Sequence, residues 1–471
     1  MRPRTNSTKI DYVIFSIYLA LVAIGWAMIY TVGSGQGTYH EGFFNFLRTP
    51  VGRQLIWVAI AMGVFVITLA IDPKFWRTFS NPVYLLSILV LLGVLVFGKT
   101  IKGATSWFDF GSGITLQPSE FAKFGTSVAL AGFLSSYTNN LRSFRSTFYA
   151  ILIFAVPAFL ILMQPDAGSA LVFLSFFIVL YREGFPGWVF GVGFILIVVF
   201  VLGLVHSPWA IAALLAFLGF LLLVFYQKNN QGYWIAGLAV LVLTSMVGIA
   251  RGQLKYVVMA NSALLVLTLI GLWLRQKHQQ LYLSVLVAFL VCTSLAFAAN
   301  YTFEQVLKPH QKERIGVWLK PDEADLKDAA YNLNNSKMAI GAGGLLGKGF
   351  LEGRITQGNF VPEQITDFIF SAVGEEQGFL GVVIILALFF GLLARIVFIA
   401  ERQRTVFNRV YAYGVASVLF IHIFINIGMT MGLLPIIGIP LPFLSKGGSS
   451  LLGFTLMIAV LLKLDAERGR S

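Results

Sequence analysis

Asp367 is the residue of this sequence best placed for acid–base chemistry. It lies in the segment 357–370, together with Glu363, and the apolar stretch 368–370 follows it directly. A carboxylate that is partly desolvated by apolar neighbours is a better proton acceptor near neutral pH. A structural role is also open, since Thr366 or Asp367 could instead cap a helix that begins here.

Three further charged residues stand at the edges of apolar runs. Glu120 and Lys123 follow Gln117-Pro118-Ser119, and their i, i+3 spacing puts them on one face of a helix. Asp166 follows Gln164-Pro165 between two apolar runs. Ionisable side chains at membrane depth are costly, so we expect them to bind substrate or to pair with each other. An internal ion pair between Glu120 and Lys123 is the structural alternative.

The glycine-rich stretch 341–349 could offer backbone N–H groups, and Lys348 its ammonium, to a phosphate. It lacks the spacing of a P-loop, because no Ser or Thr follows a Gly-Lys pair at the required position. Arg314, Lys337 and Lys446 are further cations that could stabilise a negatively charged group.

Composition identifies the elements that must position these residues as membrane-spanning helices. The 471 residues are 57% hydrophobic and 12% charged, whereas a soluble protein carries about a quarter charged residues. The mean hydropathy is +0.81. The single cysteine, Cys292, excludes a disulfide framework. The net charge of +13 is typical of basic loops beside anionic lipid, and we expect no nucleic-acid partner.

Fourteen apolar runs predict an all-α polytopic membrane protein. Several are shorter than the roughly 20 residues that a spanning helix needs, so these helices must extend into their polar flanks. The first run is long enough to span and is not expected to be a cleaved signal peptide. The runs are 13–30, 55–70, 83–97, 124–134, 148–163, 170–181, 188–205, 209–226, 233–250, 257–274, 281–298, 379–400, 410–434 and 451–462.

Basic residues predict which side of the membrane each loop occupies. Lys and Arg are concentrated in the loops that share a side with the N-terminus, which predicts that both termini are cytoplasmic. The polar, glycine-rich segment 300–376 follows an odd number of predicted helices and is therefore expected outside. Loops longer than about 15 residues are usually functional or disordered, and the apolar stretches here favour a functional one. The five histidines show no metal-ligand spacing, and His422 is interpreted as a packed helix residue.

In their order along the chain, these motifs resemble the SEDS family of RodA/FtsW cell-wall polymerases over nearly the whole sequence. The wording Gly358-Asn359-Phe360-Val361-Pro362-Glu363-Gln364 is more similar to the RodA (elongation) branch than to the FtsW (division) branch. The matching stretches are Trp107-Phe108-Asp109, 117–123, Gln164-Pro165-Asp166-Ala167-Gly168, 335–341, 360–370, 374–376, 426–435 and 438–449.

The resemblance implies a SEDS-type helical bundle with a family core of ten spanning helices and about four inserted ones. The implied organisation is an N-terminal half over 1–205, inserted helices over 206–280 and a C-terminal half over 281–471 that contains the catalytic loop 300–376. Family members polymerise lipid II at the outer face of the cytoplasmic (inner) membrane. Their partners are a class B penicillin-binding protein, which cross-links the strands, and membrane proteins of the elongation complex.

The resemblance also implies roles for individual residues. It carries the essential loop aspartate of the family onto Asp367 and other important polar positions onto Glu120, Lys123 and Asp166. The implied reaction is an inverting hexosyl transfer in which Asp367 takes the proton of the sugar hydroxyl and undecaprenyl diphosphate leaves.

Three positions depart from the family pattern. Ile365 stands where His is usual, Lys446 where Tyr is usual, and Ser106 where an Arg precedes the Trp. If the usual His or Arg contributes to catalysis elsewhere, Lys446 or Arg314 must replace it here.

The candidate substrate-binding residues are all charged, acidic or basic, and could contact the sugar or the diphosphate of the substrate. A divalent cation, Mg²⁺ or Mn²⁺, could assist them, and no other cofactor is expected. Two alternatives to the polymerase are a flippase for lipid-linked sugars and a non-catalytic scaffold for a penicillin-binding protein. The candidates are Glu120, Lys123, Asp166, Arg314, Lys337, Lys348, Glu363 and Lys446.

Overall fold

The computed structural model describes most of the chain and divides it into two compact units. The first unit comprises Met1–Phe185 and Arg314–Ser471, and the second comprises Pro186–Glu313. The second unit is longer than the predicted insertion 206–280, whose limits stay a prediction. The described residues are 10–35, 43–101, 103–111, 115–136, 141, 143–227, 231–275, 279–307, 309–319 and 328–468.

Helices dominate the chain, which is a multi-pass membrane protein as predicted. Within the described residues, twelve helices are long and apolar enough to cross a membrane. All fourteen expected runs are helical. The two outside the twelve are α6 (Pro118–Ser135), which carries Glu120 and Lys123, and the shorter segment Ala167–Arg182, which a 3₁₀ turn interrupts.

The first unit is built around two buried helices. The apolar windows of α19 and α20 are 72% and 83% buried, whereas none of the other ten candidate spans exceeds 39%, so these two form the centre of their unit. The elements of this unit before the long loop are α1 (Tyr12–Gly35), α2 (Phe43–Arg48), α3 (Pro50–Ala70), α4 (Pro73–Thr78), α5 (Ser80–Phe97), α6, α7 (Phe144–Met163), α8 (Ala167–Val172), η1 (Phe173–Ser175) and α9 (Phe176–Arg182). Those after it are α18 (Ile369–Glu401), α19 (Val406–Thr430) and α20 (Gly448–Ala466).

A small sheet departs from the purely helical prediction. Strands β1 (Lys99–Ile101), β2 (Ala104–Asp109) and β3 (Thr115–Leu116) pair antiparallel in the order β1-β2-β3. The backbone N–H of Thr105 in β2 donates to the carbonyl of Gln164, 3.1 Å away, at the end of α7. The sheet therefore ties the loop after α5 to the junction that carries Asp166.

The second unit is an antiparallel helical array with its own apolar core. Tyr282 and Phe289 of α14 pack there with Phe220 of α11 and Leu265 of α13. Cys292 is buried and free, as its apolar surroundings predicted. The helices are α10 (Trp188–Val205), α11 (Pro208–Tyr226), α12 (Gln231–Ala250), α13 (Leu254–Arg275) and α14 (Gln279–Tyr301), followed by the π-helical η3 (Thr302–Val306).

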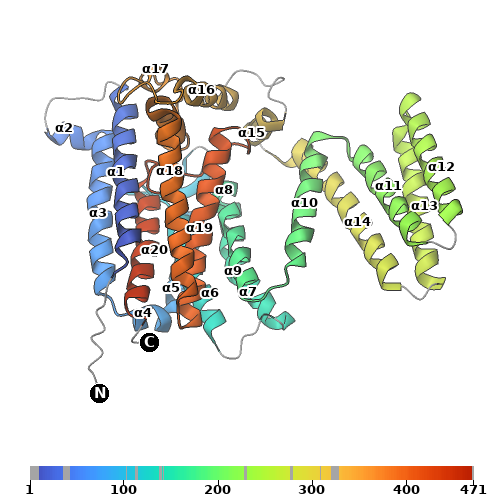
Figure 1. Ribbon diagram of the computed structural model, residues 1–471, viewed down its shortest axis with the longest axis horizontal. Coiled ribbons are helices and arrows are strands. Elements are labelled where there is room, and N and C mark those ends of the chain that lie inside the picture. The colour runs from blue at the N-terminus through green and yellow to red at the C-terminus, as the bar shows by residue number, and fades with distance from the viewer. Residues whose placement is uncertain are drawn as a thin grey trace. The chain divides into compact units, whose positions relative to one another are not determined.

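The described parts of the long loop are folded, which agrees with the prediction that it is not disordered. The loop contains α15 (Pro309–Leu319), α16 (Asp328–Ala342) and α17 (Arg354–Gln357), and α16 and α17 lie across the upper ends of α18 and α1 (Figure 1). The buried residues Val317, Leu333, Val361, Phe368 and Ile436 form one apolar cluster beneath it. This cluster fixes the loop against the segment that joins α19 to α20.

The glycine-rich stretch 341–349 supplies backbone hydrogen bonds at a break in α18, and its predicted contact with a phosphate stays a prediction. Helix α18 departs from helical geometry at Gly378, whose φ is 63°. The N–H groups of Lys348 and Gly349 donate to the carbonyls of Glu375 and Glu376, at 2.9 and 3.0 Å. The carbonyls of Gly344 and Leu345 accept from the N–H groups of residues 379 and 380. These N–H groups are used because the backbone polar groups freed by the break need partners.

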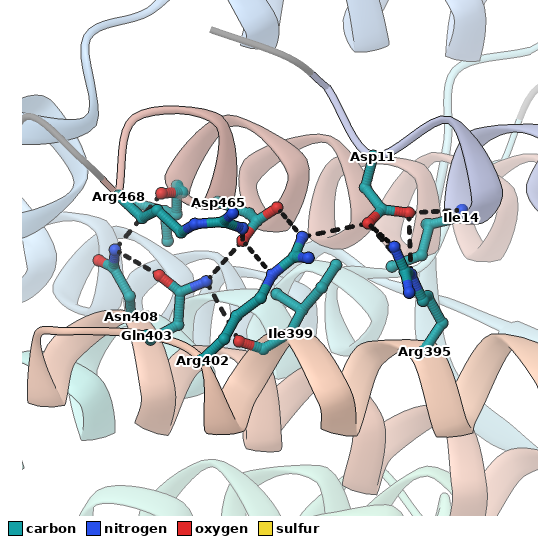
Figure 2. A network of polar contacts seen from close by, with 10 residues as sticks. Asp11, Ile14, Arg395, Ile399, Arg402, Gln403, Asn408, Asp465 and Arg468 are labelled. Atoms are coloured by element: carbon teal, nitrogen blue, oxygen red, sulfur yellow. Dashed lines mark hydrogen bonds and ion pairs between the residues drawn. The ribbon is translucent and has the colours of Figure 1, made fainter. Parts of the chain in front are cut away.

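A network of ion pairs joins the ends of α1, α18 and α20 (Figure 2). Arg402, at the end of α18, contacts both Asp11 and Asp465. Arg395 donates two hydrogen bonds to one oxygen of Asp11, at 3.1 and 2.8 Å. Burial opposes ionisation of Asp11, but the hydrogen bond from Arg395 and the charge of Arg402 hold the pKa of its carboxyl below the usual value. The network fastens three helix ends in the first unit.

Candidate functional site

Asp367 lies in a turn directly before α18 and is half-buried. The helix begins at Ile369 with Phe368 as its N-cap residue, so neither Thr366 nor Asp367 takes the capping position considered above. The backbone N–H of Asp367 donates to the carbonyl of Glu363, at 2.9 Å. The turn thus presents both carboxylates of the motif on the same short segment.

Gly438 brings Asp367 and Arg314 to one place. A Cβ atom built on Gly438 would lie 3.4 Å from Oδ2 of Asp367 and 3.7 Å from Nη1 of Arg314. The φ of Gly438 is 76°, a conformation that favours glycine. A carboxylate and a guanidinium, both predicted site residues, therefore border the same glycine in the segment between α19 and α20.

One face of α19 holds this segment in place. The amide nitrogen of Asn426 donates to the carbonyl of Asp367, at 2.9 Å, and to that of Ile439, at 2.8 Å. One turn earlier, Nδ1 of His422 is 3.1 Å from the carbonyl of Pro440. Both side chains are at most 1% exposed. The backbone of Asp367 and the two residues that follow Gly438 are thus fixed by a buried helix.

Glu120 and Lys123 form a buried ion pair in the core of the first unit. The distance from Nζ of Lys123 to Oε1 of Glu120 is 2.7 Å, and the side chains are 1% and 2% exposed. The same Nζ lies 2.9 Å from Nε2 of His422 and 5.5 Å from the ring centroid of Phe454. Oε2 of Glu120 has no hydrogen-bond partner within the described residues. The alternative of an internal pair is confirmed, and direct substrate contact by these residues stays a prediction.

Asp166 is the N-cap of α8 and belongs to a separate polar cluster. Its Oδ1 accepts from the N–H of Ser169, at 3.0 Å, and its Oδ2 accepts from the amide of Gln117, at 2.9 Å. A Cβ on the adjacent Gly168 would lie 2.9 Å from the carbonyl of Ile437. Asp166 therefore supports the helix that packs beneath the segment carrying Gly438.

Two of the family departures contact each other. The backbone N–H of Lys446 donates to the carbonyl of Ile365, at 2.9 Å. Burial, followed by the charge of Arg53 on α3, lowers the pKa of the Lys446 ammonium, and the charge of Glu363 partly opposes this. Lys446 thus adds a cation beside the turn that carries Asp367, whereas Ile365 is buried. Ser106, the third departure, is also buried, in β2.

Lys337 and Lys348 stand apart from these contacts and are exposed. Nζ of Lys337, on α16, would lie 2.6 Å from a Cβ built on Gly432, just after α19. Lys348 belongs to the stretch that repairs α18. Their predicted roles at the substrate diphosphate stay predictions. Among the residues that the structure describes, no three His, Cys, Asp or Glu side chains form a group that could hold a metal ion.

Sequence reasoning did not assign Gly438, Asn426, His422 or Arg53 to the site. A signal was present for two of them, because His422 and Asn426 have i, i+4 spacing and lie on one face of a mainly apolar helix. The prediction that His422 is packed is confirmed by its 1% exposure. Its two hydrogen-bond partners lie outside α19, on α6 and in the segment after α19, so the spacing alone could not identify them.

Comparison with known proteins identifies several relatives along the full length. A model of the cell cycle protein family of FtsW, RodA and SpoVE matches residues 11–221 and 213–470. The peptidoglycan glycosyltransferase RodA of Treponema pallidum is 32% identical over 464 residues, covering 97% of this chain and 98% of that protein. The peptidoglycan glycosyltransferase MrdB of Escherichia coli is 28% identical over 464 residues, covering 98% and 95%.

Solved structures share the fold. A chain from a peptidoglycan synthase complex that coordinates polymerization and crosslinking aligns with a TM-score of 0.63 at 22% identity, covering 98% of this chain and 99% of that one. The rod shape determining protein RodA of Thermus thermophilus aligns with a TM-score of 0.54 at 21% identity, covering 98% and 97%. At these identities the likeness shows the architecture alone.

Proposed function

The chain belongs to the FtsW, RodA and SpoVE family, and we propose that it is a peptidoglycan glycosyltransferase that polymerises lipid II during cell elongation. The names of the RodA and MrdB relatives support the activity. The observation that carries the mechanism is that Asp367 and Arg314 both lie next to Gly438.

Asp367 is the general base of the proposed reaction. A sugar hydroxyl is a poor nucleophile at neutral pH, and a positioned carboxylate takes its proton as the new bond forms. The hydroxyl oxygen attacks the anomeric carbon of the donor while the bond from that carbon to the diphosphate oxygen breaks. The bonding pair leaves with undecaprenyl diphosphate, and the configuration at the anomeric carbon is inverted.

Arg314 stabilises the departing diphosphate. A guanidinium presents a fork of N–H donors that matches phosphate oxygens, and its charge is permanent. Its place beside Asp367 puts positive charge where negative charge develops. Lys446, in the segment between α19 and α20, is a second cation near the turn, since its backbone N–H donates to the carbonyl of Ile365.

The carboxylates that would hold a divalent cation are Asp367 and Glu363. Mg²⁺ often uses one or two carboxylates together with substrate phosphates, so these two side chains are of the ligand type that such an ion takes. A bound cation would neutralise charge on the diphosphate.

The setting of the reaction is the outer face of the cytoplasmic membrane, with both termini inside. The excess of Lys and Arg in the loops that share a side with the N-terminus supports this orientation. A class B penicillin-binding protein is the proposed partner, and the likeness to a chain from a peptidoglycan synthase complex supports it.

The test is polymerisation of fluorescent lipid II by the purified chain, with and without the transpeptidase partner, resolved on a gel. We expect glycan ladders from the wild type and none from Asp367→Asn, with both proteins equally folded in detergent. Ladders of wild-type yield from Asp367→Asn would refute the base assignment. An inactive wild type that moves lipid II across vesicle membranes would identify a flippase instead.

A further inference from the structure

His422 connects a buried ion pair to the backbone beneath the candidate site. Its Nε2 lies 2.9 Å from Nζ of Lys123, which also pairs with Glu120, and its Nδ1 lies 3.1 Å from the carbonyl oxygen of Pro440. The imidazole is 1% exposed and packs edge-on against the ring of Phe454. It is a polar side chain on a buried membrane helix, where such groups are costly unless every polar atom is paired.

The two partners of His422 fix its protonation. A carbonyl oxygen only accepts, so Nδ1 must carry the hydrogen that is donated to Pro440. An ammonium only donates, so Nε2 must be the unprotonated nitrogen that accepts from Lys123. The ring is therefore neutral with the hydrogen on Nδ1, and the positive charge stays on Lys123 beside the carboxylate of Glu120.

The hydrogen bond from His422 to the carbonyl of Pro440 fixes the segment that contains Gly438. Residues 434–447 are not helical, so their carbonyls need partners other than those of a helix ladder. The side chain of Asn426 donates a hydrogen bond to the carbonyl of Ile439, and that of His422 donates one to the carbonyl of Pro440. Gly438, which borders Asp367 and Arg314, comes directly before these two anchored residues.

We propose that His422 is a positioning residue, through which the Glu120–Lys123 pair holds Gly438 against Asp367 and Arg314. This inference rests on the proposed glycosyltransferase function. Lys123 orients the imidazole by occupying Nε2, and the imidazole in turn fixes the carbonyl of Pro440. A displacement of about 1 Å at a reacting group costs on the order of 100-fold in rate, so this backbone anchor affects turnover more than substrate binding.

Two substitutions of His422 distinguish the roles of the two ring nitrogens. The side-chain amide of Asn reaches the position of Nδ1, so His422→Asn keeps the donor to Pro440 and loses the contact with Lys123. The amide of Gln reaches the position of Nε2, so His422→Gln keeps a partner for Lys123 and loses the donor to Pro440. The two variants differ by one methylene group and place the same amide at different ends of the ring.

The experiment measures kcat and KM for lipid II with both variants, wild type and a matched control. The control is Ser417→Ala, a buried polar residue of α19 whose hydroxyl donates to Gly414 within the same helix. We expect kcat of His422→Gln to fall about 10- to 100-fold with KM changed less than about threefold. Ser417→Ala should stay within about threefold of wild type in both parameters. His422→Asn keeps the donor to Pro440 but is no longer oriented by Lys123, so its kcat should fall by an intermediate amount, about three- to tenfold.

Several outcomes would overturn the inference. Equal kcat in His422→Gln and wild type would do so, as would a fall in kcat that is larger in His422→Asn than in His422→Gln when both variants unfold at the wild-type temperature. A rise in KM at unchanged kcat in His422→Gln would reassign the residue to substrate binding. If His422→Gln fails to fold, His422→Asn decides, because a kcat equal to that of wild type would show that the contact with Lys123 does not act on this segment. An inactive wild type would instead remove the proposed function on which the inference rests.

Discussion

The amide of Asn426 donates to the backbone carbonyl of Asp367, at 2.9 Å, and to that of Ile439, at 2.8 Å. One side chain of α19 therefore joins the turn that presents the proposed base to the segment that presents Gly438. Asn426 is fully buried, so both of its hydrogen bonds are shielded from water. This amide therefore helps to fix Asp367 relative to Gly438, together with the contact between His422 and Pro440.

Replacing Asn426 by Asp should disrupt the site although the shape is kept. An ionised Asp has no donor, so the carbonyls of Asp367 and Ile439 would lose their partner, at about 1–3 kcal/mol each. We expect the midpoint of thermal unfolding to fall and kcat with lipid II to drop at least about tenfold. Wild-type kcat in a folded Asn426→Asp protein would show that the amide does not position Asp367.

Replacing Arg314 tests the charge at the diphosphate. Arg314→Gln keeps hydrogen-bonding capacity but removes the charge, and we expect kcat to fall by about 10²–10³, as when one stabilising donor is lost. Arg314→Lys retains the charge without the fork and should lie between Gln and wild type. The measurement is initial rate against lipid II concentration. An Arg314→Gln rate within twofold of wild type would show that another cation fills this role.

The lowered pKa of Lys446 predicts that kcat/KM decreases on the alkaline side of its pH profile. Burial and the charge of Arg53 lower its pKa below the ordinary value of 10.5. If its ammonium binds the diphosphate, kcat/KM falls as pH rises through this lowered pKa. Lys446→Arg, which stays charged, should move the decrease to higher pH. If the decrease occurs at the same pH in Lys446→Arg as in wild type, another group is responsible for it.

The lowered pKa of Lys446 also predicts how this residue affects the stability of the folded protein. A lysine with a lowered folded pKa opposes folding while it is charged, so its cost is fully present below the folded pKa. The cost is relieved as pH rises from the folded pKa towards the unfolded value of 10.5. Lys446→Met should therefore raise the unfolding temperature near neutral pH and have less effect at higher pH. The measurement is thermal unfolding across this range, and a pH-independent difference would contradict it.

Substitution of the glycines that pack against the break in α18 should destabilise the protein. A Cβ on Gly347 would lie 2.1 Å from the carbonyl oxygen of Glu376, and its φ of 84° disfavours alanine by about 1–2 kcal/mol. Gly347→Ala should therefore lower the unfolding temperature. Gly341→Ala is the matched control, because no atom lies within 4 Å of its Cβ. Equal unfolding temperatures for both variants would show that the close approach of the two backbones is dispensable.

The network at the far end of α18 should affect stability without affecting chemistry. Asp465→Asn weakens the pair with Arg402, whose side chain is 24% exposed, and we expect a loss of about 1–3 kcal/mol after allowance for solvent screening. Activity per folded molecule should be unchanged, because Arg402 lies roughly 50 Å along the helix from Ile369. Glu467→Gln, in a nearby surface pair with Lys463, is the control. A fall in kcat for Asp465→Asn would show coupling along α18.

Several features could be predicted from the sequence because they depend on local chemistry. Apolar runs must be helices in a membrane, since only an intrasegment ladder satisfies their backbone there. The i, i+3 spacing placed Glu120 and Lys123 on one face of a helix, and the structure forms their ion pair. The ordered motifs identified the family, and the comparisons confirm it.

Tertiary structure alone decided how these parts act together. Asp367 and Arg314 both lie next to Gly438, whose φ of 76° favours glycine, yet the three residues are distant in the sequence. The N–H groups of the glycine-rich stretch suited a phosphate locally, but the break at Gly378 claims them. His422 is packed as predicted, but its contacts with Lys123 and Pro440 depend on the tertiary structure. Spacing along the chain specifies which side chains share an element, whereas pairing between elements follows from burial of the whole core.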